Sequence, residues 1–304
     1  MDSKKVYVKL HAGGAGRWIY GGYFNAWKNL NYEVAFYNSL DDIEDAKDTY
    51  ILMAIDGDVN TQSRLLVVEN SYKTFLYAQP NEFPKPWGAH PNFKCMCPVE
   101  FIDKLNGIKN VYLWSFGNTS DFHTLWKGVH HIPLAFDNLS YKNISPVNRG
   151  IDVCFVGGWA DNGFDEKRKL LIEHFREFED SGLTCSIFVN QGLSHEKETN
   201  IMYNSKVALN IHDAYQRVLG LDTNERTFKS LGTTGVLVSD DIKCLDDFDF
   251  KIVRENDPKK YLEAVMKYIF DTPEDELHGI REYNINEIME NHTYTHRVNS
   301  LMAL

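Results

Sequence analysis

Hydrophobic residues along this chain fall into short runs separated by longer polar stretches, a pattern typical of alternating strands and helices. In the first half, residues 6–10 alternate as a strand, HAGGAG follows as a glycine-rich turn, and residues 20–30 form an aromatic-rich helical stretch. Further strands are predicted at residues 33–37, 50–55, 74–78 and 111–114. This β-loop-α-β opening predicts an α/β domain with a largely parallel sheet.

A second cycle of the same pattern follows the segment HHIPLAFDNLSYKNISPVNRG, which occupies residues 130–150. A strand is predicted at residues 151–156, a glycine pair comes next, and a helix is predicted over residues 166–179. The remaining strands are predicted at residues 184–189, 207–211 and 236–238. Two successive α/β units of this kind predict two Rossmann-like domains that face each other across a cleft.

Composition agrees with a two-domain globular protein. The chain has 304 residues, of which 43% are hydrophobic and 13% aromatic, enough to bury a large core. Its opening, MDSKKVYVKL, lacks an apolar segment suited to export, and later apolar runs are far shorter than the ~20 residues that span a bilayer. We therefore expect no membrane span and a cytoplasmic location, in the host cytoplasm if the protein is viral.

Charge and cysteine content narrow the possible partners. The net charge of −11 argues against broad binding to nucleic acid, although it allows a local basic groove. Five scattered cysteines fit reduced thiols better than a disulfide framework. The Cys95 and Cys97 pair lacks the second cysteine pair that a structural zinc site needs, so no zinc site is predicted.

The stretch NERTFKSLGTTGVLVSDD, residues 224–241, carries the clearest chemical signal. It predicts a short helix capped by Asp222 or Thr223, ending at Gly232 and followed by a buried strand. Arg226 would lie in the first helical turn, where a cation opposes the helix dipole by roughly 0.3–1 kcal/mol. An anionic ligand at that helix end would reverse the sign of this interaction.

Two glycine-rich turns could also approach a ligand. Gly14 belongs to the turn after the first strand, but the spacing is not that of a dinucleotide fingerprint, and Asn38 replaces the expected acid. Gly157 and Gly158 precede a predicted helix that bears Arg168, so backbone N–H groups and a guanidinium could hold a diphosphate there. The neighbouring Lys167 is expected on a solvated helix face.

Taken in order, FVGGW, an arginine-bearing helix, VALNIH, NERTF with TTGVLVSD, and HTYTHRV resemble the two-domain GT-B glycosyltransferases, especially the CgeB-like group. Phage enzymes that glucosylate hydroxymethylated cytosine in DNA are similar in the same region. The resemblance is strongest over residues 150–300. It implies an acceptor-side domain at residues 1–135, a nucleotide-sugar domain at residues 136–288, and a C-terminal helix, residues 289–304, that crosses back to the first domain.

The resemblance also implies roles for individual residues. Arg226 matches the arginine that faces the donor diphosphate, Asn224 matches the asparagine of the motif, and Asn210 and His212 match a strand end that lines the donor site. Lys229 departs from the family, which usually has a glutamate there that binds the ribose hydroxyls. Glu225 need not reach the same atoms, and Lys229 is expected to face either the diphosphate or solvent.

The sequence does not decide which residue is the catalytic base. His11, Asp56 and Glu82 are candidates from predicted strand ends, since an inverting enzyme needs a base near the acceptor hydroxyl. Asp56 and Asp58 alternatively resemble a metal-binding DxD motif, which would make a divalent cation possible, although the resemblance implies none is obligatory.

The sequence thus predicts a glycosyltransferase that moves a sugar from a nucleoside-diphosphate sugar, expected to be a UDP-sugar, to a hydroxyl. The acceptor could be a glycan, a small molecule or hydroxymethylated DNA. The alternatives are a non-catalytic nucleotide-sugar-binding protein on a transferase fold and a metal-dependent DxD glycosyltransferase.

Overall fold

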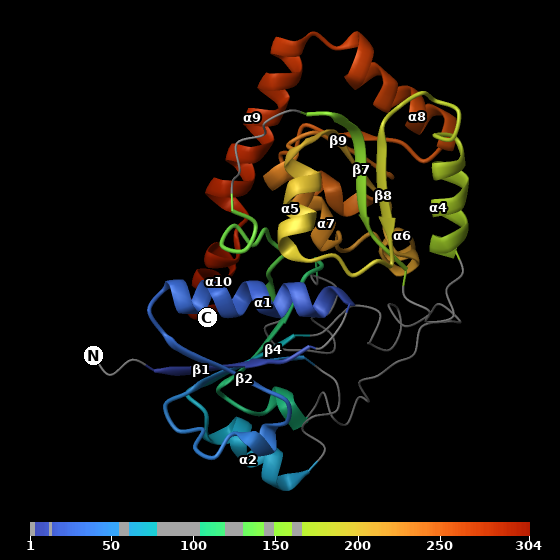
Figure 1. The fold of residues 1–304 in the computed structure, drawn as a ribbon. Coiled ribbons are helices and arrows are strands. Elements are labelled where there is room, and N and C mark those ends of the chain that lie inside the picture. Colours follow the sequence, from blue (N-terminus) through green and yellow to red (C-terminus); the bar gives the residue numbers. More distant parts are fainter. Residues whose placement is uncertain are drawn as a thin grey trace. The chain divides into compact units, whose positions relative to one another are not determined.

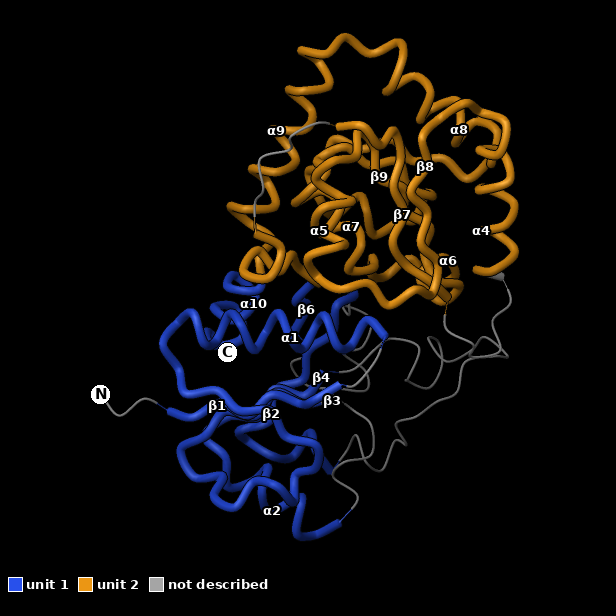
Figure 2. Tube along the Cα trace, viewed as in Figure 1, with its two compact units in different colours: residues 1–133, 294–304 blue, residues 134–293 orange. Residues whose placement is uncertain are grey.

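The computed structural model describes residues 4–11, 14–54, 61–77, 104–118, 130–142, 149–159 and 166–304. The chain divides into two compact units (Figure 2). Unit 1 comprises Met1–Pro133 together with Tyr294–Leu304, and unit 2 comprises Leu134–Thr293. Each unit is built on its own parallel sheet.

The sheet of unit 1 has six strands in the order β2-β1-β3-β4-β5-β6, and every neighbouring pair is parallel. Its strands are β1 (Lys5–Lys9), β2 (Glu33–Tyr37), β3 (Tyr50–Ala54), β4 (Lys73–Tyr77), β5 (Val111–Ser115) and β6 (His130–His131). The short apolar runs of the sequence mark five of these strands correctly, whereas β6 lies at the start of the segment that is expected from the sequence only to connect the two units.

Helices cover both faces of this sheet. In Figure 1, α1 (Gly14–Asn29) lies on one side of the strands, and α2 (Gln62–Asn70) lies on the other together with the short turn η1 (Leu40–Asp42). Helix α10 (Tyr294–Met302) returns from the end of the chain to pack on α1. The packing is close, because a Cβ at Gly22 would lie 2.3 Å from the Tyr294 ring.

Helix α1 begins earlier than its apolar pattern predicts. Because glycines disfavour helices, the sequence predicts a turn at Gly14 and Gly16. In the structure Gly14 has a φ of 61° and starts the helix. A Cβ at Gly16 would lie 2.8 Å from Nδ1 of His11, so the close approach of this side chain requires the missing Cβ.

The sheet of unit 2 has five parallel strands in the order β11-β10-β9-β7-β8. Its strands are β7 (Ile151–Gly157), β8 (Cys185–Val189), β9 (Ser205–Asn210), β10 (Leu237–Ser239) and β11 (Val253–Arg254). The helical segments are α4 (Glu166–Arg176), α5 (His195–Tyr203), α6 (Ala214–Leu219), α7 (Glu225–Thr233), η5 (Lys243–Asp247), α8 (Pro258–Met266), the π-helical turn η6 (Lys267–Asp271) and α9 (Glu274–Asn291).

Helices again cover both faces of the sheet. Figure 1 shows α4 and α8 together on one side and α5 and α7 on the other. The buried core includes Val153 and Phe155 of β7, Leu209 of β9 and Tyr261 and Val265 of α8. These side chains come from strands and helices far apart in sequence, so the core forms only when the sheet is assembled.

Helix α7 corrects the predicted end of the motif helix. It continues through Gly232 to Thr233 and does not stop at the glycine. A Cβ at Gly232 would lie 2.6 Å from the Phe136 ring. This glycine therefore serves the packing of the segment that enters unit 2, since any larger residue would clash with the ring.

The two parallel-sheet units confirm the predicted α/β class, and the packing of α10 on α1 confirms that the end of the chain returns to the first unit. Within the described part of the chain, no helix combines the length and the apolar character needed to cross a bilayer.

Candidate functional site

The strand order of unit 2 creates a switch point between β7 and β9. From β7 the chain first adds β8 on one side, and later adds β9 on the other side. The connections after these two strands therefore leave in opposite directions. Open parallel sheets bind ligands outside the carboxyl ends of strands at such a point.

Helix α7 begins beside this switch point. Its N-cap is Asn224, whose Oδ1 accepts a hydrogen bond from the Thr227 N–H at 3.2 Å, so the predicted cap at Asp222 or Thr223 is wrong. Asn224 also donates through Nδ2 to Asn210 Oδ1 at 3.0 Å. The cap side chain thus closes the helix end and ties it to the end of β9.

Arg226 is fixed between the ends of β7 and β9. Its Nε donates to Val156 O at 2.8 Å, and its Nη1 donates to Asn210 Oδ1 at 2.9 Å and to Ile211 O at 3.3 Å. The guanidinium also lies over the Phe155 ring, 4.6 Å from its centroid. Carbonyl oxygens at the strand ends thus partly offset the unfavourable position of this cation in the first turn.

Gly157 allows Arg226 to lie where it does. A Cβ on this glycine would be 2.0 Å from Nη2 of the arginine, which is far inside van der Waals contact. No acceptor for Nη2 is found within the described residues. The guanidinium therefore has N–H groups left to bind an anion beside the Gly157 backbone.

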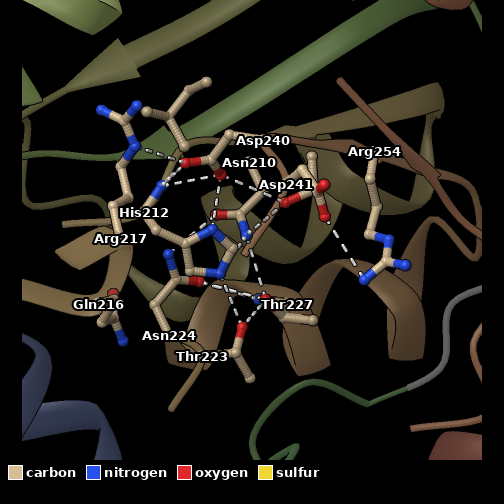
Figure 3. A network of polar contacts seen from close by, with 12 residues as sticks. Asn210, His212, Gln216, Arg217, Thr223, Asn224, Thr227, Asp240, Asp241 and Arg254 are labelled. Carbon is tan, nitrogen blue, oxygen red and sulfur yellow. Dashed lines mark hydrogen bonds and ion pairs between the residues drawn. The ribbon is translucent and has the colours of Figure 1, made fainter. Parts of the chain in front are cut away.

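A buried polar network fixes the end of β9 (Figure 3). His212 lies between Asp240, whose Oδ1 is 2.6 Å from Nδ1, and Thr223, whose Oγ1 is 2.7 Å from Nε2. Thr223 and Thr227 are joined through their hydroxyls at 2.6 Å, and Asn210 Nδ2 donates to Thr227 Oγ1 at 3.1 Å. Burial acts to raise the pKa of Asp240, but the contacts from His212 hold that pKa below its usual value.

This network determines which way the Asn210 amide points. Its Nδ2 faces the hydroxyls of Thr227 and Ser239, so its Oδ1 faces Arg226 and Asn224. Tyr261 of α8 holds the backbone of the same residue. Its hydroxyl accepts a hydrogen bond from the Asn210 N–H at 3.1 Å and donates one to Val238 O at 2.7 Å. The acceptor of Arg226 is therefore held from several sides.

Lys167 supplies a second cation. The expectation of a solvated Lys167 is wrong, because its side chain is 4% exposed and its Nζ lies 2.7 Å from Asp213 Oδ1. Burial lowers the pKa of Lys167 to about 8, Asp213 opposes that shift, and Arg226 adds to it. The charges of Lys167 and Arg226 therefore act on each other. We call Lys167, Asn210, Asp213 and Arg226 the strand-end site.

The neighbouring cation, Arg168, lies elsewhere. It is exposed, and its guanidinium lies over the Trp159 ring, 5.8 Å from the centroid. Gly158 is in close contact with Asn190, whose Oδ1 accepts from the Trp159 N–H at 3.2 Å. Lys167, one position earlier in the chain, thus belongs to the same strand-end site as Arg226, whereas Arg168 stacks on an aromatic ring.

Lys229 takes neither of the two predicted orientations, because its side chain pairs with carboxylates of the protein. Its Nζ lies 2.6 Å from Glu198 Oε1 and 4.0 Å from Glu225 Oε2, and its side chain is 6% exposed, which excludes a solvent-facing position. Tyr141 donates to Glu198 Oε2 at 2.7 Å. Burial raises the pKa of Glu225, and Lys229 opposes that shift. A buried lysine beside two carboxylates is thus compensated by the protein itself.

The remaining candidates belong to unit 1 or lie outside the described residues. The His11 ring stacks on Tyr20 with centroids 4.7 Å apart, near the start of α1 where Gly14 lies. Asp56, Asp58 and Glu82 fall outside the described residues. Within the described ranges, no group of three or more His, Cys, Asp or Glu side chains is arranged to hold a metal ion.

The two parallel-sheet units define the class of two-domain Rossmann-like α/β proteins. Solved structures of similar fold include TarM, with a TM-score of 0.54 and 9% identity over 87% of this chain, which spans 57% of that one. An alpha-glucosyltransferase in complex with UDP and mismatched DNA has a TM-score of 0.58 and 11% identity over 99% of both chains. The alpha,alpha-trehalose 6-phosphate synthase of Burkholderia multivorans has a TM-score of 0.52 and 11% identity over 93% of this chain and 74% of that one.

The sequence model of a family described as glycosyl transferase-like matches residues 148–303, just over half of the 304 residues. The chain therefore belongs to the glycosyl transferase-like family and is a glycosyltransferase. No curated protein sequence matches it. The predicted resemblance to GT-B glycosyltransferases is confirmed.

Sequence reasoning missed three members of the structure around Arg226. The sequence favours a solvated helix face for Lys167, and Asp213 and Tyr261 carry no motif signal. Helical spacing offered one clue, because Lys167 lies four residues before the core residue Leu171 and on the same helix face. The pairing with Asp213 depends on how α4 meets the end of β9, which spacing does not encode.

Proposed function

We propose that this glycosyltransferase takes its sugar from a UDP-sugar and holds the leaving diphosphate in unit 2 at the strand-end site. The observation that carries the proposal is the placement of Arg226 at the β7 and β9 switch point, with unused N–H groups beside Gly157 and a second cation, Lys167, nearby. A diphosphate matches this combination of charge and donors.

The same placement suits the chemistry of sugar transfer. As the bond between the sugar and the diphosphate breaks, the leaving group gains negative charge. Arg226 is already fixed by Val156, Asn210 and Ile211, so it needs little rearrangement to stabilise that charge. Two fixed cations would neutralise the leaving group in the way a divalent cation does, so the proposed transfer requires no metal ion.

The choice of uridine rests on the fold neighbours. The alpha-glucosyltransferase structures, which match this chain over 99% of both lengths, contain UDP or UDP-glucose. We assign the donor to unit 2, with Gly157, Gly158, Asn210, Asn224 and Arg226 near the diphosphate. His212, Glu225 and, in unit 1, Gly14 complete the proposed donor-binding residues. Arg168 and Lys229 are left out of this proposed set, because Arg168 lies over the Trp159 ring and Lys229 is paired with Glu198.

For the acceptor we propose a hydroxyl bound in unit 1, with a hydroxymethylated DNA base as the first candidate. The supporting observation is that the neighbours of nearly equal length were solved with DNA, one with a 13-mer that contains an HMU base. A sugar phosphate or glycan is the second candidate, favoured by the trehalose-phosphate synthases. We propose His11, Asp56 and Glu82 as candidates for the base that takes the proton of the acceptor hydroxyl.

The proposal is tested by a thermal-shift panel of UDP, ADP, GDP and their glucose conjugates, followed by an assay of UDP release with and without acceptors. A ligand present at 100 times its Kd should add about 2.7 kcal/mol of stability. We expect UDP and UDP-glucose to stabilise the protein and hydroxymethylated duplex DNA to accelerate UDP release relative to unmodified DNA.

The outcomes separate the rival functions. Binding without any release of UDP would favour the non-catalytic binding protein. A preference for another nucleotide would overturn the uridine assignment, and acceleration by sugars or sugar phosphates but not by modified DNA would move the acceptor to the second candidate.

A further inference from the structure

Asp213 is the carboxylate that pairs with the buried Lys167 of the strand-end site. Its Oδ1 lies 2.7 Å from Nζ of Lys167, and among charged groups it acts most strongly on Lys167 and on Arg226. The two ends of the ion pair differ in exposure, because the Lys167 side chain is 4% exposed and that of Asp213 is 37% exposed. The cation is therefore held in place while the carboxylate has room to move toward solvent.

A buried ammonium next to a guanidinium needs a negative charge close by. Without one, desolvation and repulsion between Lys167 and Arg226 would both destabilise the empty site. Asp213 supplies that charge. A bound diphosphate would supply the same charge in the same place, and the Asp213 carboxylate would then repel the ligand.

Building on the proposed diphosphate site, we propose that Asp213 is an internal counter-ion of the strand-end site, which pairs with Lys167 when the site is empty and is displaced when a diphosphate binds. Asp213 thereby limits affinity for the donor and for the UDP product. This role favours release of UDP, because the carboxylate can take the place of the departing phosphate on Lys167.

Other charges face this group and stay in place. Asp240 acts on both cations but is tied to His212 at 2.6 Å, and Glu198 acts on Arg226 but is tied to Lys229 at 2.6 Å. Glu225 also acts on Arg226 and is buried. Asp213 has the most exposed side chain among these carboxylates and, besides Lys167, is bonded among the described residues only to the first turn of α6 as its cap, so it is the one placed to turn toward solvent.

The test measures the affinity of uridine, UMP and UDP for Asp213→Asn and Asp213→Ser by calorimetry. Asp213 is also the N-cap of α6, and asparagine and serine are as good as aspartate at that position, so the local helix should be kept. We expect UDP to bind the variants roughly three- to tenfold more tightly than wild type. UMP should gain less and uridine nothing, because the effect scales with ligand charge.

Asp152→Asn is the matched control. Asp152 pairs with Lys206 at 2.7 Å, so the variant removes the same charge from a lysine–aspartate pair of equal length. This pair lies at the amino ends of β7 and β9, and its lysine is more exposed than Lys167. Its UDP affinity should equal that of wild type.

Weaker or unchanged UDP binding in both neutral variants would overturn the counter-ion role and show that Asp213 only holds Lys167 in position. An equal gain for uridine and UDP would overturn it as well. If wild type binds UDP but the variants show no gain, this inference alone fails. If wild type binds no nucleotide, the proposed donor fails with it.

Discussion

Replacing Arg226 by lysine separates the chemical role of the side chain from its structural role. The substitution keeps the positive charge but removes the planar fork that donates to Val156 O, Asn210 Oδ1 and Ile211 O at 2.8, 2.9 and 3.3 Å. A lysine has one nitrogen and cannot hold the same position between β7 and β9. The positive charge would remain near the ends of β7 and β9, but it would no longer be held beside Gly157 where the diphosphate is proposed to bind.

The expected magnitudes for Arg226→Lys differ between activity and stability. Hydrogen bonds from a charged group contribute about 1.5–3 kcal/mol each, and lysine recovers part of them, so we expect a loss of stability of about 2 kcal/mol. In a unit of this size that loss lowers Tm by roughly 4–8 °C. Loss of an aimed donor at the leaving group should cost about 2.7–4 kcal/mol, which lowers kcat by roughly 100- to 1,000-fold.

Arg281→Lys is the matched control for this prediction. Arg281 of α9 also donates to two backbone carbonyls in unit 2, Thr234 O at 3.1 Å and Lys206 O at 3.4 Å, but near the amino end of β9. Both variants should therefore lose comparable stability. UDP release from UDP-glucose, measured below both transition temperatures, should fall only in Arg226→Lys. Equal activity in the two variants would refute the role assigned to Arg226.

Three further outcomes are expected. UDP affinity should fall as pH rises through about 8, because burial lowers the pKa of Lys167 to about 8 and the lysine loses its charge above that pH. Calorimetry in buffers of different ionisation enthalpy should show proton uptake when UDP binds. The variant Lys167→Met should abolish both the pH dependence and the proton uptake. Lys229→Glu should destabilise the protein by about 3–5 kcal/mol in urea unfolding, because it places a third carboxylate beside Glu198 and Glu225, and an unchanged midpoint would contradict the buried ion pair. Deleting residues 294–304 should unfold unit 1, since α10 packs on α1, and a truncated chain of full thermal stability would show that this packing is dispensable.

Most of the fold was readable from the sequence. Strand runs such as residues 33–37 and 185–189 are short, apolar and bounded by turn residues, and these local properties persist in the structure. The order of strands and helices along the chain then restricts the sheets to parallel connections. Glycines were the main source of error, because Gly16 and Gly232 are needed for close packing and lie inside helices, where their intrinsic preference predicts a break.

For the site, the sequence by itself determined that Arg226 is unusual, because its place in a first helical turn follows from local pattern alone. Only the tertiary structure decided what surrounds it. Asn210 orients the guanidinium, while Lys167 and Asp213 meet beside it, and Lys229 is turned into a pair with Glu198. These contacts join elements that lie tens of residues apart in the chain. Their geometry depends on strand order and on the desolvation of each charge, neither of which is encoded in the spacing of residues along the sequence.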